Sequence, residues 1–286
     1  DQDFVALGVR APSEPMSAAI EAAKAADAVV LVLGSAAVTE AEGYDREDIG
    51  LPGAQDELAR AVLAANPNTV IVLNTGSPFA MPWIGGAKAV LQMWLPGETA
   101  PDALAAVLTG ARSPGGRLPV TFPKAFGVHP AHRVEPDAKV CEYAEGLAVG
   151  YRWFDEAGGE PLFPCGHGRA YTTFEMGGLQ APATAKAGEP VRVEVTVTNT
   201  GQRAGDEVVQ LYVAPKSPRL PRPPKELKAF AKVALAPGET RTISLELEPN
   251  AFACWDDGWT VDAGEYDLLV GRSSGDIRLR ATIALT

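Results

Sequence analysis

The hydrophobic pattern divides the chain into two parts with different periodicities. Before residue 124, short and continuous apolar runs alternate with longer segments of helical composition. The apolar runs are rich in β-branched residues, as in strands that are buried on both faces of a sheet. They cover residues 28–33, 69–73 and 89–94. Helices are predicted around these runs, over residues 17–27, 55–65 and 102–108. This alternation predicts a mostly parallel sheet with helices on both faces.

From residue 171 onward the pattern changes to strict alternation of apolar and polar positions. Such a period of two is typical of strands with one buried face. It is clearest at residues 191–197, 240–247 and 276–283. Turn-forming residues separate these runs, and about seven short strands over some 115 residues predict a fibronectin-III-like or immunoglobulin-like sandwich. Residues 124–170, rich in Pro, Gly and His, predict an ordered connector without regular structure.

We therefore predict three segments, an α/β domain over residues 1–123, the connector over 124–170 and the β-sandwich over 171–286. A chain of 286 residues suits two such domains. Its net charge of -11 argues against nucleic acid or an anionic membrane surface as a partner. No apolar stretch reaches the roughly 20 residues of a membrane helix, and the first residues lack the pattern of a signal peptide.

The spacing of the cysteines and the absence of known cofactor motifs argue against several kinds of site. The three cysteines, Cys141, Cys165 and Cys254, show no CxxC spacing. They predict neither a disulfide framework nor a metal site, and they favour a reducing, cytoplasmic compartment. There is no GxGxxG after a strand, no phosphate-binding loop, no HExxH and no GxSxG. We accordingly expect no cofactor and no metal.

The most promising candidate site is the acidic segment 39–48, which follows the first predicted strand. It carries one Arg and five carboxylates. In open parallel sheets, ligands meet the loops at the carboxyl ends of the strands, and this loop is one of them. Neighbouring carboxylates favour the protonated form of one another, as acid catalysis near neutral pH requires. The alternative is a solvated acidic surface loop, since most charge runs simply face water.

Several short strings, taken in order, resemble the C-terminal half of glycoside hydrolase family 3 β-glucosidases. The resemblance begins with Glu42-Gly43-Tyr44-Asp45-Arg46 and extends over nearly the whole chain. It continues with Leu51-Pro52-Gly53, Gln55-Asp56-Glu57-Leu58, Asn74-Thr75-Gly76-Ser77-Pro78, Trp94-Leu95-Pro96-Gly97, Pro114-Gly115-Gly116-Arg117-Leu118-Pro119, Glu145-Gly146-Leu147-Ala148-Val149-Gly150-Tyr151-Arg152 and Pro161-Leu162-Phe163-Pro164. Each string alone is weak, but the ordered set at family-like spacing is specific. The resemblance implies a partial α/β-sandwich domain followed by a fibronectin-III-like domain.

The resemblance also implies a division of chemical labour. Enzymes of this family are retaining: an Asp on an N-terminal barrel attacks the sugar, and a Glu of the sandwich domain acts as acid and then as base. That Glu precedes Gly-Tyr-Asp-Arg, so the resemblance places it at Glu42, with Glu40 as the competing position. With Glu42 as the acid, the supporting or substrate-binding residues are Glu40, Tyr44, Asp45 and Arg46. The implied partners are a β-glycoside substrate and a barrel-bearing segment or chain.

Alternative functions stay open at this level. This chain contains no barrel and no nucleophile string, and we expect it to begin partway through the sandwich domain. A β-xylosidase or an enzyme that deglycosylates natural products would carry the same strings. A non-catalytic carbohydrate-binding or structural module would present the acidic segment as a solvated surface. A homo-oligomer is also compatible with the sequence.

Overall fold

The computed structural model describes residues 14–36, 39–42, 46–129, 139–140 and 142–286. The chain forms two compact units, which we describe separately. The first comprises residues 1–103 and 122–141, and the second comprises residues 104–121 and 142–286. Within the described ranges, no helix combines the length and the apolar character needed to cross a membrane.

A parallel three-stranded sheet organises the first unit, as the alternation of apolar runs predicts. Its strands lie in the order β1-β2-β3 and comprise β1 (Val29–Gly34), β2 (Thr69–Asn74) and β3 (Ala89–Gln92). The register aligns Gly34 with Asn74, so the carboxyl ends of β1 and β2 coincide. Loops that leave these two strands therefore start side by side.

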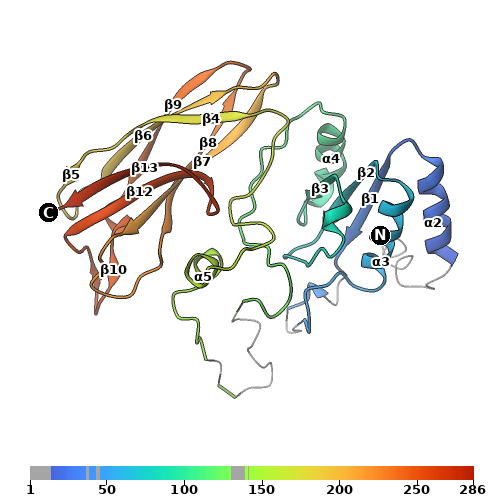
Figure 1. The fold of residues 1–286 in the computed structure, drawn as a ribbon, viewed down its shortest axis with the longest axis horizontal. Coiled ribbons are helices and arrows are strands. Elements are labelled where there is room, and N and C mark those ends of the chain that lie inside the picture. The colour runs from blue at the N-terminus through green and yellow to red at the C-terminus, as the bar shows by residue number, and fades with distance from the viewer. Residues whose placement is uncertain (1–13, 37–38, 43–45, 130–138, 141) are drawn as a thin grey trace. The chain divides into compact units, whose positions relative to one another are not determined.

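Helices α2 (Glu14–Ala25) and α3 (Gln55–Ala65) accompany this sheet in the first unit, with short 3-10 turns η2 (Ile84–Gly86) and η3 (Gly97–Thr99). Helix α4 (Ala100–Leu108) follows η3 and is divided between the two units. All three helices begin within a few residues of their predicted positions. Helices α2 and α3 pack against each other (Figure 1). Helix α3 ends at the predicted residue because Asn66 and Pro67 follow it, and the Asn66 amide donates to two carbonyls of the α2 end, those of Ala23 and Ala26.

The predicted burial of the first strand is wrong on one face. In β2, Thr69 and the three residues Ile71, Val72 and Leu73 are buried, so both faces of this central strand are covered. In β1, by contrast, Val30 is 49% and Val32 41% exposed. Both side chains lie on the same face of an outer strand, because side chains alternate along a strand. The composition alone cannot distinguish an outer strand from a central one.

The second unit contains the predicted all-β domain, a sandwich of mostly antiparallel strands in which only the short β5 pairs in parallel, with β13 (Figure 1). One sheet has the order β5-β13-β12-β7-β8 and the other the order β4-β6-β9. The strands are β4 (Phe174–Gln180), β5 (Thr184–Ala185), β6 (Val191–Asn199), β7 (Gly205–Pro215), β8 (Glu226–Leu235), β9 (Thr240–Leu247), β10 (Cys254–Trp255), β11 (Trp259–Thr260), β12 (Gly264–Ser273) and β13 (Asp276–Leu285), with a 3-10 turn η5 (Pro249–Ala251). The antiparallel pair β10-β11 forms a separate hairpin.

The inward positions of these strands form one continuous apolar core. Strand β6 supplies a valine at every second position, from Val191 to Val197, and all four are buried. Strand β9 pairs with it and adds Leu245 and Leu247, while Leu211 and Leu268 face them from the other sheet. The period-two pattern of the sequence therefore marks the buried face correctly.

The predicted connector contains more regular structure than expected. Helix α5 (Tyr151–Ala157) lies within it, where a structureless segment is predicted. It escapes prediction because it has seven residues, too few for a clear helical period. Elsewhere in this unit, Leu118 and the segment 166–167 exchange backbone hydrogen bonds of 2.7 and 2.9 Å, which form a short antiparallel contact.

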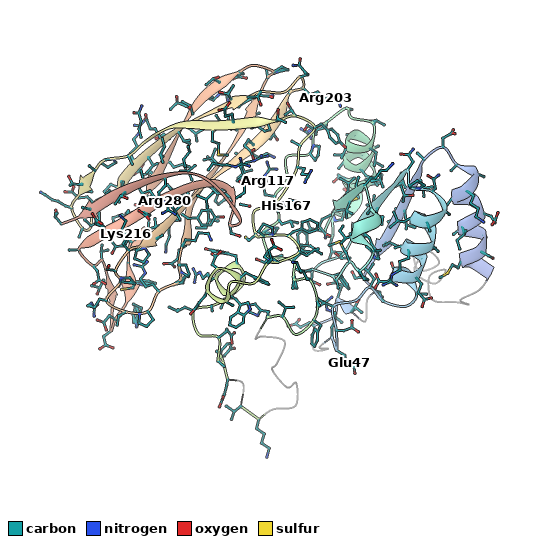
Figure 2. The ribbon with its side chains drawn as sticks, in the orientation of Figure 1. Glu47, Arg117, His167, Arg203, Lys216 and Arg280 are labelled. Carbon is teal, nitrogen blue, oxygen red and sulfur yellow. The ribbon has the colours of Figure 1, made fainter. Side chains whose placement is uncertain are left out.

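A buried ionic cluster joins this contact to the sandwich. The Glu207 carboxylate is completely buried on β7 and pairs with the Arg117 guanidinium. Arg272 on β12 lies 2.8 Å from the second carboxylate oxygen. Figure 2 shows Arg117 and His167 close together at this end of the sandwich. A buried carboxylate needs such partners because its desolvation is otherwise very costly.

Candidate active site

The acidic loop begins where the sheet ends, as predicted. It spans residues 35–54, between β1 and α3. Ser35 N donates to the carbonyl oxygen of Asn74 at 3.2 Å, which ties the start of this loop to the end of β2. A Cβ added to Gly34 would lie 2.9 Å from the same carbonyl oxygen, so glycine permits this close approach. The loop and the turn after β2 therefore leave the sheet in contact.

Glu40 is held on the turn that follows β2. Its Oε1 accepts a hydrogen bond of 3.0 Å from Gly76 N, and Ser77 Oγ lies 3.5 Å away. A Cβ added to Gly76 would lie only 2.6 Å from Glu40 Oε2. The carboxylate is thus packed directly on a backbone that has no side chain. The hydrogen bond at Oε1 and the close packing of Oε2 on Gly76 together hold the Glu40 carboxylate on this turn.

Glu42 lies two residues further along and is exposed to solvent. The predicted supporting residues Tyr44 and Asp45 lie outside the described residues. Among the remaining carboxylates of the segment, Asp48 Oδ1 accepts from Gly50 N at 2.7 Å and shapes the end of the loop. Glu42 is therefore accessible, whereas Glu40 and Asp48 are engaged by backbone amides.

Arg46, also predicted to be a supporting residue, packs on an aromatic ring. Its guanidinium carbon lies 4.5 Å from the centroid of the buried Phe79 ring, a cation–π geometry. Its Nη1 is buried without a hydrogen-bond partner among the described residues. Nearby, Ala80 N donates to Ile49 O at 2.6 Å, so the loop is fixed to the segment around Phe79. Arg46 thus carries a buried Nη1 whose donors have no acceptor among the described part of the loop.

A side chain of β3 holds the turn after β2 in place. Gln92 Nε2 donates to both the carbonyl and the hydroxyl oxygen of Thr75, at 3.1 and 3.0 Å. Thr75 is completely buried. Trp94 follows β3 and meets Phe122 edge to face at 6.1 Å, so the structure assigns it a packing contact. A rigid turn of this kind gives Gly76 N a defined direction toward Glu40.

Sequence reasoning missed the role of Gln55 at the base of the loop. Its Oε1 accepts from Gly34 N at 2.8 Å, and its Nε2 donates to Gly34 O at 2.8 Å. Nε2 also donates to Pro52 O at 3.0 Å. In the sequence this residue simply starts a predicted helix, and no local signal shows that its amide returns to a strand 21 residues earlier.

The neighbouring Asp56 has a structural partner of its own. It accepts a hydrogen bond of 2.7 Å from the indole nitrogen of the buried Trp83. Burial raises the pKa of this carboxyl above its usual value, although the Trp83 hydrogen bond and the positive charge of Arg60 lower it. Its neighbour Asp48 adds a smaller rise. Asp56 therefore anchors α3 to the Trp83 segment.

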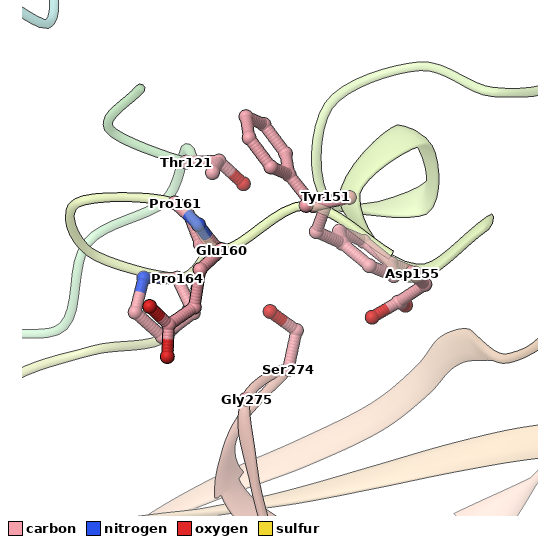
Figure 3. A pocket seen from close by; sticks show the side chains of 10 residues that line it. Thr121, Tyr151, Asp155, Glu160, Pro161, Pro164, Ser274 and Gly275 are labelled. Carbon is pink, nitrogen blue, oxygen red and sulfur yellow. The ribbon is translucent and has the colours of Figure 1, made fainter. Parts of the chain in front are cut away.

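A separate hollow of about 190 Å³ lies in the second unit (Figure 3). Its lining includes Tyr151, Thr121 and Ser274. Asp155 faces it and is paired with Lys225 Nζ at 2.5 Å; burial raises the pKa of this carboxyl, and Lys225 opposes the rise. None of the predicted site residues that the structure describes lines this hollow. Among the described residues, no cluster of His, Cys, Asp or Glu is arranged to hold a metal ion.

Comparison with known proteins identifies relatives of both parts of the chain. Residues 6–171 match the glycosyl hydrolase family 3 C-terminal domain, and residues 207–274 match the fibronectin type III-like domain. A β-glucosidase from Rhizobium radiobacter is 47% identical over 276 residues, which is 93% of this chain and 34% of that protein.

Solved structures agree with these matches. A family 3 β-glucosidase from Bifidobacterium adolescentis superposes with a TM-score of 0.91 at 40% identity, over 96% of this chain and 41% of that one. A β-glucosidase from Streptomyces venezuelae, solved with D-glucose, gives a TM-score of 0.89 at 38% identity, over 95% of this chain and 35% of that one. The chain spans about a third of the length of the curated relatives it matches.

Proposed function

Because the chain belongs to glycoside hydrolase family 3, we propose that it supplies the general acid/base of a retaining β-glucosidase. The similar proteins named above are β-glucosidases, which favours a β-glucoside over a β-xyloside or a glycosylated natural product. The chain corresponds to about a third of those proteins. The remaining part of the enzyme would carry the barrel and the Asp nucleophile.

Glu42 is the residue that we assign to proton transfer. A general acid has to reach the glycosidic oxygen, so its carboxyl group must be accessible. Glu42 is exposed, whereas Glu40 accepts a hydrogen bond from Gly76 N. This difference in accessibility carries the assignment, together with the position of Glu42 directly before Gly-Tyr-Asp-Arg. Glu40 is then the residue that fixes the loop.

The proposed chemistry has two steps. In the first, the Asp of the barrel attacks the anomeric carbon while Glu42 donates its proton to the leaving oxygen. In the second, Glu42 as a carboxylate removes a proton from water, which attacks the same carbon and releases the sugar with its configuration retained. The two carboxyl groups then have to lie about 5–5.5 Å apart.

Three further residues support this assignment. Arg46 has a guanidinium whose Nη1 is buried without a hydrogen-bond partner among the described residues, and a neighbouring carboxylate would satisfy it. Tyr44 and Asp45 stand beside it in the sequence and are proposed as supporting or substrate-binding residues. Their contribution is to orient the loop and the bound sugar.

The test is to replace Glu42 in the complete enzyme. We expect Glu42→Gln to lower kcat/KM on cellobiose by about 10²–10⁴-fold, because the alcohol leaving group needs a proton. A 2,4-dinitrophenyl β-glucoside needs little protonation, so its kcat/KM should fall much less. Sodium azide should restore turnover of that substrate by Glu42→Ala and yield β-glucosyl azide.

Two matched variants of the same loop serve as controls. Glu47→Gln removes an exposed carboxylate five residues away and should leave both substrates within about twofold of the original enzyme. Glu40→Gln keeps an oxygen that accepts from Gly76 N and should be much milder than Glu42→Gln. Normal cleavage of cellobiose by Glu42→Gln would contradict the assignment.

A further inference from the structure

The amide of Gln55 completes the open edge of β1 at the root of the acidic loop. Within a parallel strand, the N–H and C=O of one residue point to the same side. Here both groups of Gly34 bind the Gln55 amide, at 2.8 Å each, on the side away from β2. The side chain thus takes the place of a neighbouring strand. One residue satisfies a donor and an acceptor that would otherwise be left at the sheet edge.

The same side chain also holds the other end of the loop. Gln55 Nε2 donates to Pro52 O at 3.0 Å, and Gln55 itself is the first residue of α3. The end of β1, the last turn of the loop and the start of α3 therefore meet at one amide group. Three hydrogen bonds to a single neutral side chain close a loop of 20 residues at its base.

Two contacts thus hold the loop on either side of the proposed acid. On the N-terminal side, Glu40 is held on Gly76 N at 3.0 Å. On the C-terminal side, Gln55 holds Pro52 and the strand end. Glu42 lies between these two contacts in the sequence, and its side chain is exposed. The contacts on both sides therefore limit where the backbone of Glu42 can lie.

We propose that Gln55 is a positioning residue for Glu42, an inference that rests on the proposed function. Its amide does not take part in proton transfer. It sets the separation of the two ends of the loop and thereby the reach of the Glu42 carboxyl toward the leaving oxygen. Displacing a catalytic group by about 1 Å is enough to cost on the order of 10²-fold in rate.

The chemistry of an amide suggests a variant that can be switched by pH. Gln55→Glu has the same shape, and its neutral carboxyl group offers one donor and one acceptor, as the amide does. Once ionised it has acceptors only and places a negative charge against the carbonyl oxygen of Gly34. Asp56 is the next residue along the chain, and its carboxyl group is present in every variant, so the comparison between variants isolates the group at position 55.

The experiment compares Gln55→Leu, Gln55→Glu and Glu57→Ala in the complete enzyme. Glu57 is an exposed residue of the same helical turn, so its replacement controls for a change at the start of α3. For Gln55→Leu we expect kcat/KM on cellobiose to fall about 10- to 100-fold. On the 2,4-dinitrophenyl glucoside we expect a loss of less than about threefold, because that step needs little protonation.

The pH profile gives a second and independent readout. The activity of Gln55→Glu on cellobiose, divided by that of the original enzyme, should be near one at acidic pH and fall as the pH rises. Glu57→Ala should keep a constant ratio close to one. If Gln55→Leu fails to fold, this ratio alone decides the question.

Two results would overturn the inference. One is an equal loss on both substrates with a lowered melting temperature, which indicates a structural role only. The other is a pH-independent ratio for Gln55→Glu. Failure of the proposed function would look different, since Glu42→Ala would then show neither leaving-group dependence nor azide rescue. Normal behaviour of Glu42→Ala with unresponsive Gln55 variants rejects only the role of Gln55.

Discussion

At the scale of single residues, the main feature of the site is the close contact between the backbone of Gly76 and the carboxylate of Glu40. Gly76 N donates to Glu40 Oε1 at 3.0 Å, and the space that a Cβ would occupy is taken by Glu40 Oε2. Leu95 limits the space on the same side, with Cδ1 at 3.2 Å from that position. The atom most in the way belongs to the flexible end of a side chain. A methyl group should therefore displace Glu40 without breaking the fold.

We expect Gly76→Ala in the complete enzyme to separate activity from stability. The added methyl group pushes the Glu40 carboxylate from the turn, so kcat/KM should fall about 10- to 100-fold. The melting temperature should change little, because no backbone has to move. Gly85→Ala is the matched control, since nothing lies within 4 Å of its Cβ position. Equal kcat/KM for the two variants would contradict the role of Glu40 in fixing the loop.

The sequence could identify this site only to the level of a loop. The position of Glu42 directly before Gly-Tyr-Asp-Arg identifies it as the acid through a resemblance, but composition alone does not distinguish Glu40 from Glu42. What separates them is the hydrogen bond of Glu40 to a turn 36 residues away. The amide bonds of Gln55 to Gly34 are equally distant in the sequence. Such long-range contacts leave no local pattern, so they need the structure.

At the scale of elements, the hydrophobic period and the length of an element determine whether the sequence predicts it. The sequence locates helix α3 to the residue because Pro67 follows it and its apolar spacing is clear. The strands β6 and β9 follow from strict alternation. Exposure of one face of β1 and the existence of α5 could not be predicted. The first depends on the order of strands in the sheet, and the second has only seven residues.

The contact between the segments around Leu118 and His167 is an element that should respond to pH. The His167 ring stacks on Phe163 with centroids 4.9 Å apart and is half-buried. Burial lowers the pKa of His167 below its usual value. The positive charges of Arg169, Arg117 and Arg272 lower it further, and only Asp276 opposes them. The folded state therefore favours neutral histidine.

This shift gives a defined sign to the pH dependence of stability. The unfolded chain binds a proton at His167 near pH 6.5, whereas the folded chain binds it only at lower pH. The contribution of neutral His167 to the free energy of unfolding is therefore fully present above about pH 6.5. It is lost as the pH falls through the pKa of His167 in the folded chain. We expect the melting temperature of His167→Gln to fall less between pH 7.5 and 5.5 than that of the original chain. Above pH 7.5 the difference between the two proteins should be constant. Parallel curves throughout this range would refute the shift.

At the scale of the whole molecule, the two compact units differ in how completely their apolar surfaces are covered. The sandwich has a continuous core to which both sheets contribute. The parallel sheet has three strands, and Val30 and Val32 on its outer strand are half-exposed. Parallel sheets are normally covered on both faces. The first unit should therefore be the less stable of the two when this chain is studied alone.

Limited proteolysis of the 286-residue chain tests this difference. Cleavage follows the population of locally opened states, so the first cuts should fall before residue 142. A resistant fragment containing β4 to β13 should accumulate, and intact-mass spectrometry identifies its ends. Initial cuts within the sandwich would contradict the expected order of stability.

The same digestion of the complete enzyme examines what covers β1. The chain is about a third as long as its relatives, and we propose that part of the remaining length packs on the face of Val30 and Val32. Cleavage before residue 142 should then be slower in the complete enzyme than in the chain alone, while the sandwich fragment appears at an unchanged rate. The variant Val32→Lys tests directly whether this face is covered.

A charge on this face should have little effect on the isolated chain, where the side chain is half-exposed. In the complete enzyme, where it would be buried without a partner, it should restore fast cleavage. Equal sensitivity of both forms to Val32→Lys would mean that this face stays open to solvent in the intact protein.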